Sequence, residues 1–124
     1  MTISAAKFDV VFYEDASGHS PVVEYMERLR NENSKDARIK LNKIRDYVML
    51  LKMNGSRLTE PYCKHLEGEI YELRPASNRI LYAGWSGSKY VLLHVFTKKT
   101  QKTPRREIEQ AKRELEDFKV RFVE

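Results

Sequence analysis

Hydrophobic and polar residues follow two periods along the chain, one typical of strands and the other of helices. Residues 8–13 are mostly β-branched and aromatic, which favours a strand. A helix is expected to follow, because Ser20 is a good N-cap and Pro21 suits the first helical position. Apolar residues then recur at helical spacing up to about residue 30, at Val22, Met26 and Leu29.

A second, longer helix is predicted to begin after Ser34, which is again a residue preferred at the N-cap. Asn54 and Gly55 supply the signal for its end. The link between the two helices is short, so we expect them to form an antiparallel pair. The apolar stripe of the second helix has four members, Ile39, Ile44, Val48 and Leu51.

The second half of the chain is predicted to form a meander of three strands. Residues 56–68 have mixed character and are expected to form a loop. Candidate strands then cover residues 69–74, 79–85 and 90–96. The links between them are short, which favours antiparallel hairpins.

A last helix is predicted near the C-terminus, with Thr103 as its cap and Pro104 as its first residue. Its apolar face consists of Ile108, Ala111, Leu115 and Phe118. The order of strand, two helices, three strands and helix predicts an α+β fold with a small antiparallel sheet packed by helices. The chain has 124 residues, 41% of them hydrophobic, so we expect one modest core and a single domain over residues 1–124.

Composition excludes several classes of protein. The longest uncharged apolar run, about residues 90–96, is far shorter than the ~20 residues of a transmembrane helix. The N-terminus lacks the layout of a signal peptide, so we expect a cytoplasmic protein without a membrane partner. Cys63 is the only cysteine, and the three histidines are scattered, so no disulfide, metal site or cofactor is expected.

The positive charge of the chain is concentrated in one segment. Residues 97–106 contain five basic residues and no acidic one: Lys98, Lys99, Lys102, Arg105 and Arg106. This segment accounts for the whole formal net charge of +5. Such a concentration attracts polyanions, most commonly nucleic acid and next an acidic protein surface, although a basic run is also typical of a solvated face.

The meander is expected to bring more cations to the same place. In an antiparallel meander the end of one strand lies beside the start of the next, so Arg74, Arg79, Lys98 and Lys99 should meet at one end of the sheet. The N-terminus of the last helix begins nearby, and its unpaired N–H groups favour anions. Each arginine could instead pair with an acid that is near in sequence, Glu72 or Glu69.

A cluster of arginines and lysines can bind a phosphodiester and stabilise the extra charge of a pentacoordinate transition state. RNA carries its own nucleophile, the 2′-hydroxyl. Cleavage to a 2′,3′-cyclic phosphate then needs in-line positioning, charge stabilisation and proton transfer, but no metal. The residues therefore favour a protein that handles RNA.

Other candidate residues have a structural and a functional interpretation. His94 lies inside an apolar strand and is expected to be structural, with proton transfer as the alternative. His65 is expected at the surface or in packing, and Cys63 as a small buried residue. Four aromatic residues fit the core or the sheet faces better than a base-stacking platform: Tyr71, Tyr82, Trp85 and Tyr90.

Three segments carry a resemblance to a known family: YELR at residues 71–74, NRILYAGW at 78–85 and LLHVFTKKTQKTPRREIEQA at 92–111. They resemble the RelE/HigB toxin superfamily of type II toxin–antitoxin systems, and specifically its HigB-like, phage-derived branch. The resemblance implies a RelE-like fold of the order β-α-α-β-β-β-α. It also implies an mRNA interferase, an endoribonuclease that cleaves mRNA on the 70S ribosome, inhibits translation and is neutralised by a HigA-like helix-turn-helix antitoxin in a hetero-oligomer.

The resemblance also assigns roles to residues. Arg74 and Arg79 match the family's phosphate-contacting positions on the central strands. Lys98 or Lys99 matches the basic residue at the end of the last strand, which in the family stabilises the transition state or protonates the leaving oxygen. These four are the expected catalytic residues, and the expected substrate contacts are Lys102, Arg105, Arg106 and His94.

One departure from the family leaves the proton transfer open. Some RelE relatives have a tyrosine shortly after the last strand, whereas no tyrosine follows Tyr90 here, so a lysine, a histidine such as His94 or a ribosomal group must serve. The alternatives to an RNase are a ParE-like inhibitor of DNA gyrase and a non-catalytic RNA-binding module. An antitoxin is expected to approach the cationic end of the sheet or the N-terminal helix pair.

Overall fold

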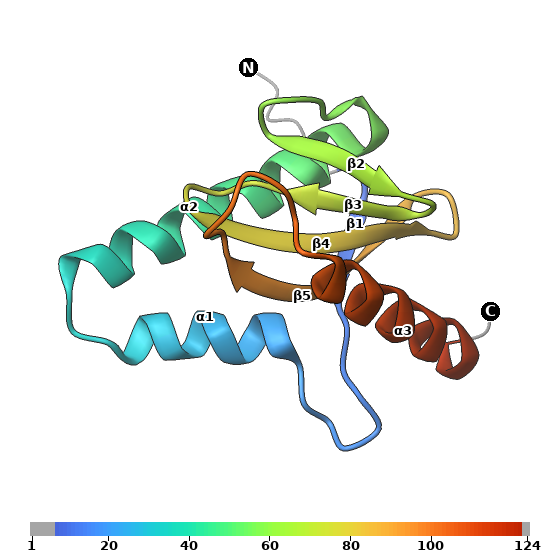
Figure 1. The fold of residues 1–124 in the computed structure, drawn as a ribbon, viewed down its shortest axis with the longest axis horizontal. Coiled ribbons are helices and arrows are strands. Elements are labelled where there is room, and N and C mark those ends of the chain that lie inside the picture. The colour runs from blue at the N-terminus through green and yellow to red at the C-terminus, as the bar shows by residue number, and fades with distance from the viewer. Residues whose placement is uncertain (1–6, 123–124) are drawn as a thin grey trace.

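The computed structural model describes residues 7–122 of the chain. It confirms the predicted α+β class, with three α-helices and a five-stranded sheet. In chain order the elements are β1 (Asp9–Phe12), α1 (Pro21–Asn31), α2 (Lys35–Asn54), the 3₁₀ turn η1 (Gly55–Arg57), β2 (Cys63–Glu67), β3 (Ile70–Leu73), β4 (Asn78–Trp85), β5 (Lys89–Thr97) and α3 (Arg105–Arg121), as Figure 1 shows.

The sheet has the strand order β1-β5-β4-β3-β2. β3, β4 and β5 form the predicted antiparallel meander, in which Leu81 pairs with Glu72 on one side and with His94 on the other. β1 adds to the far edge of β5 in parallel, with Val11 opposite Val91. The meander therefore lies between two edge strands, β1 beside β5 and β2 beside β3.

The prediction of a loop at residues 56–68 is wrong for its second part, because Cys63–Glu67 forms the edge strand β2. This strand pairs antiparallel with β3, and Gly68 makes the connecting turn at a positive φ of 54°. Lys64 and His65 are exposed, as suits a strand at the edge of a sheet. The pairing with β3, rather than a strong strand pattern of its own, stabilises β2.

The predicted starts of the first two helices are confirmed, and the predicted start of the last is wrong. The Ser20 hydroxyl accepts a hydrogen bond from the Val23 amide, and the Ser34 hydroxyl accepts one from the Ala37 amide. Pro104, with φ −59° and ψ 141°, lies outside α3, which begins at Arg105 without a side-chain cap. Thr103 does not cap this helix, because its hydroxyl is bound to the sheet instead.

Two apolar cores lie on the two faces of the sheet. The pair α1 and α2 covers one face, where Ile44 and Leu51 pack against Leu73 and Tyr82. α3 covers the other face, where Leu115 packs in the cluster that contains Ile70 and Leu81. Figure 1 shows α3 in front of the sheet, and α1 and α2 running in opposite directions. Burial of each large apolar side chain stabilises the fold by about 1.5–3 kcal/mol.

Within the described part of the chain, none of the helices combines the length and the apolar character needed to cross a bilayer.

Candidate nucleic-acid interface

A buried carboxylate, Glu72, lies at the centre of the predicted cationic site. It is only 2% exposed and lies on the face of β3 that α3 covers, because it alternates with Leu73 and shares the face of Ile70. Arg74 Nε donates a hydrogen bond to its Oε2 at 3.0 Å, and Arg79 Nε lies 3.9 Å from the same oxygen. The two guanidinium groups therefore lie on one face of the sheet, as predicted.

Arg79 is held within the protein by its own contacts. Its Nη1 donates hydrogen bonds to the carbonyl oxygens of Ala76 and Asn78, each at 2.8 Å, and 10% of its side chain is exposed. Burial lowers the pKa of Arg79 from its ordinary value, while the charge of Glu72 opposes the shift, and a guanidinium stays protonated in either case. Arg79 therefore braces the turn between β3 and β4, where Ala76 adopts a φ of 57°.

Arg74 is more accessible than Arg79. It follows directly after β3, and 23% of its side chain is exposed. Its Nε is bound to Glu72, while its terminal Nη atoms donate to no group within residues 7–122. The guanidinium is thus fixed on one side and available on the other.

A loop at residues 98–104 brings the lysines to the same end of the sheet. At its start the Lys98 amide donates to the Ser77 carbonyl at 2.8 Å, beside the turn between β3 and β4. At its end the Thr103 hydroxyl donates to Glu72 Oε1. One end of the loop is therefore attached to the turn between β3 and β4, and the other end to the carboxylate that Arg74 binds. In the described part of the chain, Lys98, Lys99 and Lys102 form no ion pair.

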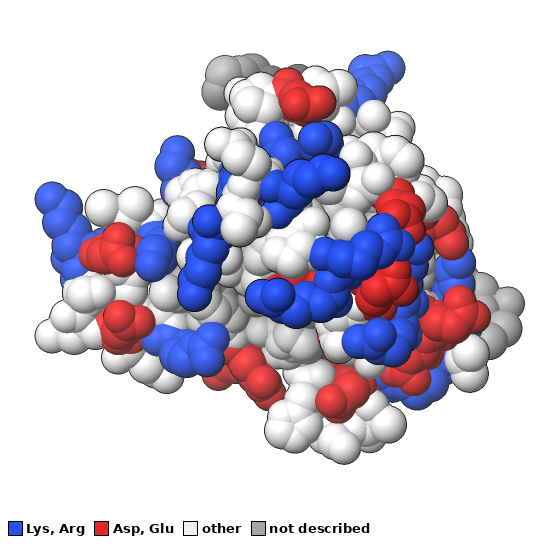
Figure 2. All heavy atoms as spheres, viewed as in Figure 1, with Lys and Arg blue, Asp and Glu red and all other residues white. Residues whose placement is uncertain are grey.

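The surface around this loop is hollowed. One hollow of about 530 Å³ is lined by Lys99 and Arg106, and an adjoining one of about 560 Å³ by Lys102, Arg105 and Arg106. In Figure 2, Lys and Arg side chains gather across the middle of the face that carries α3, with acidic side chains among them on the right. An extended anion would meet accessible cations in these hollows.

Arg105 differs from the lysines because its charge is already paired. Its guanidinium contacts Glu67 on β2 at 2.5 Å and Glu109 on α3 at 2.5 Å. Hydrogen bonds from Arg105 and then from Lys112 lower the pKa of Glu67 to about 2. Arg105 is thus turned toward the edge strand, whereas Arg106 is 82% exposed and only loosely paired with Glu107, at 3.8 Å.

His94 lies between β5 and α3, where it contacts the carboxylate of Glu107, the acid nearest to Arg106. Its Nε2 lies 2.7 Å from Glu107 Oε1, and its Nδ1 lies 3.6 Å from Glu114 Oε1. Burial lowers the pKa of His94, and the hydrogen bond to Glu107 opposes this shift. Burial also raises the pKa of Glu114 to about 7. His94 is 13% exposed, which fits the structural interpretation of this residue.

The remaining candidates lie where the structural interpretations expect them. Cys63 is buried, and its thiol donates to the Leu58 carbonyl at 3.3 Å. His65 is exposed and binds the Gly68 carbonyl at 2.7 Å. Across residues 7–122, no group of three or more His, Cys, Asp or Glu side chains is arranged to hold a metal ion.

Sequence reasoning missed the organising role of Glu72 and its contact with Thr103. The sequence indicates Glu72 only as a separate partner for either arginine, and Thr103 only as a helix cap. One signal was available, because Glu72 lies two residues from Ile70 in a strand and so shares the face of an apolar residue. A charged residue on a buried face requires partners, and arginines lie nearby in sequence.

The fold and site define a small α+β protein with a cationic loop attached to the end of its sheet. A family model described as phage-derived protein Gp49-like (DUF891) matches residues 25–116, which include the whole arginine and lysine cluster. The chain belongs to this Gp49-like family, which is associated with the toxins of toxin–antitoxin systems. Membership implies an antitoxin as a partner. A search of curated proteins found no match.

Proposed function

We propose that this protein is a HigB-like toxin, a ribosome-dependent endoribonuclease that cleaves translated mRNA without a metal ion and is neutralised by a HigA-like antitoxin. The observation that carries the proposal is the gathering of Arg74 and Arg79 around one oxygen of Glu72, with the lysine loop attached to the same carboxylate. Cations fixed on one face suit a single bound phosphodiester. Both cores pack on one sheet, which supports a single domain. The proposed substrate, mRNA on the ribosome, implies that the protein acts in the cytoplasm.

In the proposed reaction the 2′-oxygen of the RNA attacks phosphorus, and the bond from phosphorus to the 5′-oxygen breaks. The products are a 2′,3′-cyclic phosphate and a 5′-hydroxyl. The 2′-hydroxyl loses its proton to solvent or to a ribosomal group, and the ammonium of Lys98 or Lys99 gives a proton to the leaving oxygen. Arg74 offers its accessible Nη atoms to the equatorial phosphate oxygens, whose charge increases in the transition state.

The contacts of Arg79 suggest a different role from that of Arg74. Its Nη1 is occupied by two backbone carbonyls, and most of its side chain is buried. We therefore propose that Arg79 is a positioning residue. It stabilises the turn whose Ser77 carbonyl binds the Lys98 amide, and it lies near the carboxylate of Glu72 together with Arg74. Lys102 and the exposed Arg106 line the adjoining hollows and are proposed to contact phosphates on either side of the cleaved bond.

The test is to map mRNA ends in cells that express the full chain from an inducible promoter. We expect new 5′-hydroxyl ends inside translated codons, and in a purified system we expect cleavage only when ribosomes are present. The double variant Lys98→Ala, Lys99→Ala should lose at least about 100-fold in cleavage, because removal of one transition-state donor alone costs that much in other enzymes. Lys43→Ala is the matched control, since Lys43 is an exposed lysine on α2.

Each other outcome overturns a defined part of the proposal. DNA breaks without new mRNA ends would identify a gyrase inhibitor. RNA binding without cleavage, in the presence of ribosomes, would leave a non-catalytic RNA-binding module. Cleavage in the double lysine variant at the level of Lys43→Ala would move the site away from the loop.

A further inference from the structure

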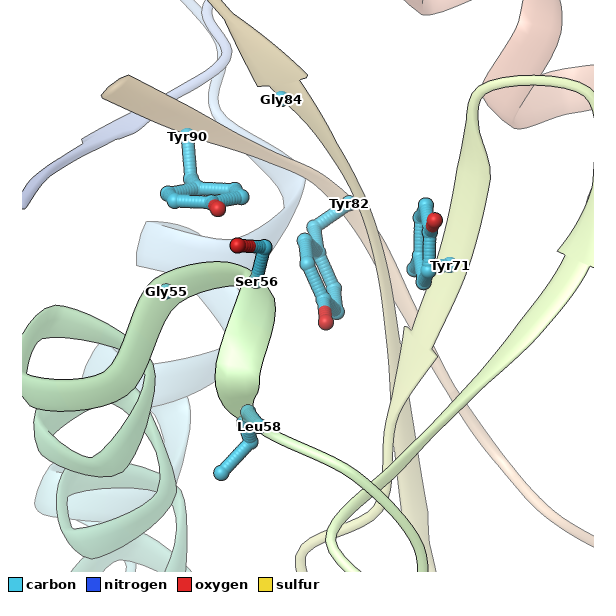
Figure 3. Close-up of a pocket in the computed structure, with 7 residues that line it drawn as sticks. All are labelled: Gly55, Ser56, Leu58, Tyr71, Tyr82, Gly84 and Tyr90. Carbon is cyan, nitrogen blue, oxygen red and sulfur yellow. The ribbon is translucent and has the colours of Figure 1, made fainter. Parts of the chain in front are cut away.

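A second candidate site lies away from the cationic cluster, on the face of the sheet that α1 and α2 cover. It is a pocket of about 190 Å³ between the sheet and the turn that follows α2. Three tyrosines from neighbouring strands form one wall, Tyr71 on β3, Tyr82 on β4 and Tyr90 on β5, and Ser56 of the turn faces them (Figure 3). The volume is below the ~300–1,000 Å³ of pockets for drug-sized ligands, so the pocket suits a single ring system.

The three rings form a row across β3, β4 and β5, and the His65 ring of β2 lies beside Tyr71 with the centroids 4.8 Å apart. The ring centroids of Tyr71 and Tyr82 are 5.7 Å apart with an interplanar angle of 30°, and Tyr90 meets Tyr82 edge-on at 6.0 Å and 67°. Tyr82 and Tyr90 are buried, whereas Tyr71 is 39% exposed, so the pocket is open on the side of Tyr71. Gly84 keeps the space above the rings free, because it has no side chain and is itself exposed.

The lining offers hydrogen bonds but no charge. All residues that line the pocket are uncharged, and Ser56 and the tyrosines place hydroxyl groups around it. Burial raises the pKa of Tyr90, so its phenol stays protonated at neutral pH. A neutral planar ring with donors and acceptors on its edge matches this lining, whereas a charged group would be desolvated without a partner.

Cations lie directly beside the pocket. An adjoining hollow of about 260 Å³ shares Ser56 with it and is lined by Lys7, Phe8 and Arg57. The Phe8 ring contacts Tyr90 edge-on at 5.9 Å, so the aromatic pocket and the cationic hollow meet at these two rings. Lys7 and Arg57 are exposed, and neither forms an ion pair with another described residue. The two hollows together present rings beside cations.

We infer that this composite site binds one nucleotide of single-stranded RNA, with the base against Tyr71, Tyr82 and Tyr90 and a phosphate at Arg57 and Lys7. Aromatic side chains that stack bases beside a cationic groove are a general way to hold single strands. The inference rests on the proposed function for the identity of the strand. It extends that function, because the site would hold the RNA at a point other than the cleaved bond.

The position in the sheet sets the distance from the proposed cleavage site. Tyr82 and Arg79 lie on opposite faces of β4, and Gly84 is five residues further along the strand than Arg79, which is about 17 Å. The base held here therefore cannot belong to the nucleotide that is cut. A second contact of this kind would raise affinity for an extended strand and would select a base at a distance from the cut.

The inference is tested by binding of the full chain to a fluorescent RNA oligonucleotide whose 2′-oxygens are methylated, so that it cannot be cleaved. Tyr71→Ala should weaken binding at least about fivefold, since loss of one base-stacking ring costs about 1–3 kcal/mol. Gly84→Leu should weaken binding similarly, because the leucine side chain would fill the pocket. The fold should tolerate this change, since a Cβ at position 84 would lie at an ordinary 3.6 Å from the Tyr90 ring. Arg57→Ala should weaken binding and reduce its dependence on salt.

The controls are Tyr62→Ala for Tyr71 and Arg45→Ala for Arg57, because both residues are exposed but line neither hollow. Circular dichroism confirms that each variant is folded. Unchanged binding in Tyr71→Ala and Gly84→Leu overturns the inference. Binding of adenosine or uridine monophosphate without binding of the oligonucleotide would also overturn the inference and would identify a site for a free nucleotide. If the pocket variants lose only antitoxin binding, the pocket holds a side chain of a protein partner, and the inference is again overturned.

The outcome is separable from that of the proposed function. The double lysine variant, Lys98→Ala with Lys99→Ala, should lose mRNA cleavage. Adding Tyr71→Ala to this variant should still weaken its binding to the oligonucleotide. If cleavage mapping fails while the pocket variants lose binding, the RNA site stands and the nuclease does not. If cleavage succeeds while the pocket variants bind normally, the nuclease stands and the second site does not.

Discussion

The hydroxyl of Thr103 donates a hydrogen bond to Oε1 of Glu72, a residue 31 positions earlier in the chain. Glu72 also binds Arg74 through its other oxygen, so one buried carboxylate connects the end of β3 to the segment before α3. The lysines of the proposed site come just before Thr103 in the chain, so this hydrogen bond fixes the end of their loop. Their position on the sheet therefore depends on a contact that no single element provides.

Thr103→Val should destabilise the protein by about 1–3 kcal/mol, because it leaves a buried carboxylate oxygen without its hydrogen bond while keeping the shape of the side chain. The matched control is Thr100→Val, whose hydroxyl binds the Lys102 carbonyl at an exposed position and should change stability by no more than about 0.5 kcal/mol. Urea denaturation measures both variants. Equal losses of unfolding free energy in the two variants would show that the hydrogen bond from Thr103 to Glu72 makes no specific contribution to stability.

Arg74→Ala and Arg79→Ala should separate activity from stability. Arg79 is buried and binds two carbonyls, so its loss should cost about 3–5 kcal/mol and much of the folded population. Arg74 is partly exposed and has one partner, so its loss should cost only about 1.5–3 kcal/mol but should remove most mRNA cleavage per folded molecule. The measurements are urea denaturation and cleavage normalised to folded protein. The roles would be reversed if Arg79→Ala remained stable and inactive while Arg74→Ala remained active.

Local sequence patterns account for most of the fold. The Ser20 and Ser34 caps each bind an amide only three residues further along the chain. The short hairpin links determine that β3, β4 and β5 pair in order. β2 could not be predicted in this way, because residues 63–67 contain only two apolar positions and pair with β3 through tertiary structure. The parallel pairing of β1 with β5 is equally non-local.

The site was predictable as a set of charges but not as a network. The meander topology places Arg74, Arg79 and Lys98 at one end of the sheet, and strand order alone is sufficient for that step. Which cations remain accessible depends on side-chain partners far away in sequence. Arg105 meets Glu67 across 38 positions, and no periodicity in the sequence indicates this pair.

Glu114 should make stability depend on pH. Burial raises its pKa in the folded chain from an ordinary 4.5 to about 7, so between these values the folded protein keeps a proton that the unfolded chain has lost. Stability therefore falls as the pH rises from about 4.5 to 7, by on the order of 3 kcal/mol from this residue, and the full loss persists above pH 7. Glu114→Gln should remove this loss, because an amide keeps the shape and the bond to Gln110 without ionising.

The measurement is the free energy of unfolding of wild type and Glu114→Gln from pH 4 to 8. His94 has the opposite effect on stability, since burial lowers its pKa, and its Nδ1 lies 3.6 Å from Glu114 Oε1. The comparison is therefore repeated in a His94→Gln background, where the difference between the two curves isolates Glu114. The groups that influence Glu114 from its own helix are Gln110, Arg113 and Glu107, and they are the same in both proteins. The control is Glu116→Gln, which is exposed on the same helix. Parallel curves for wild type and Glu114→Gln would mean that Glu114 ionises normally.

Lys102 and Arg105 lie three residues apart but should contribute differently to RNA binding. Lys102 is exposed on the loop, whereas the guanidinium of Arg105 is already neutralised by Glu67 and Glu109. Each phosphate that a cation neutralises on a single strand contributes about 0.7 to the slope of log affinity against log salt concentration. Lys102→Ala should reduce the magnitude of that slope by about 0.7, and Arg105→Ala should leave it unchanged. Fluorescence anisotropy with the methylated RNA at several KCl concentrations measures both, and a reduction of the same size in Arg105→Ala would show that RNA displaces the carboxylates from this guanidinium.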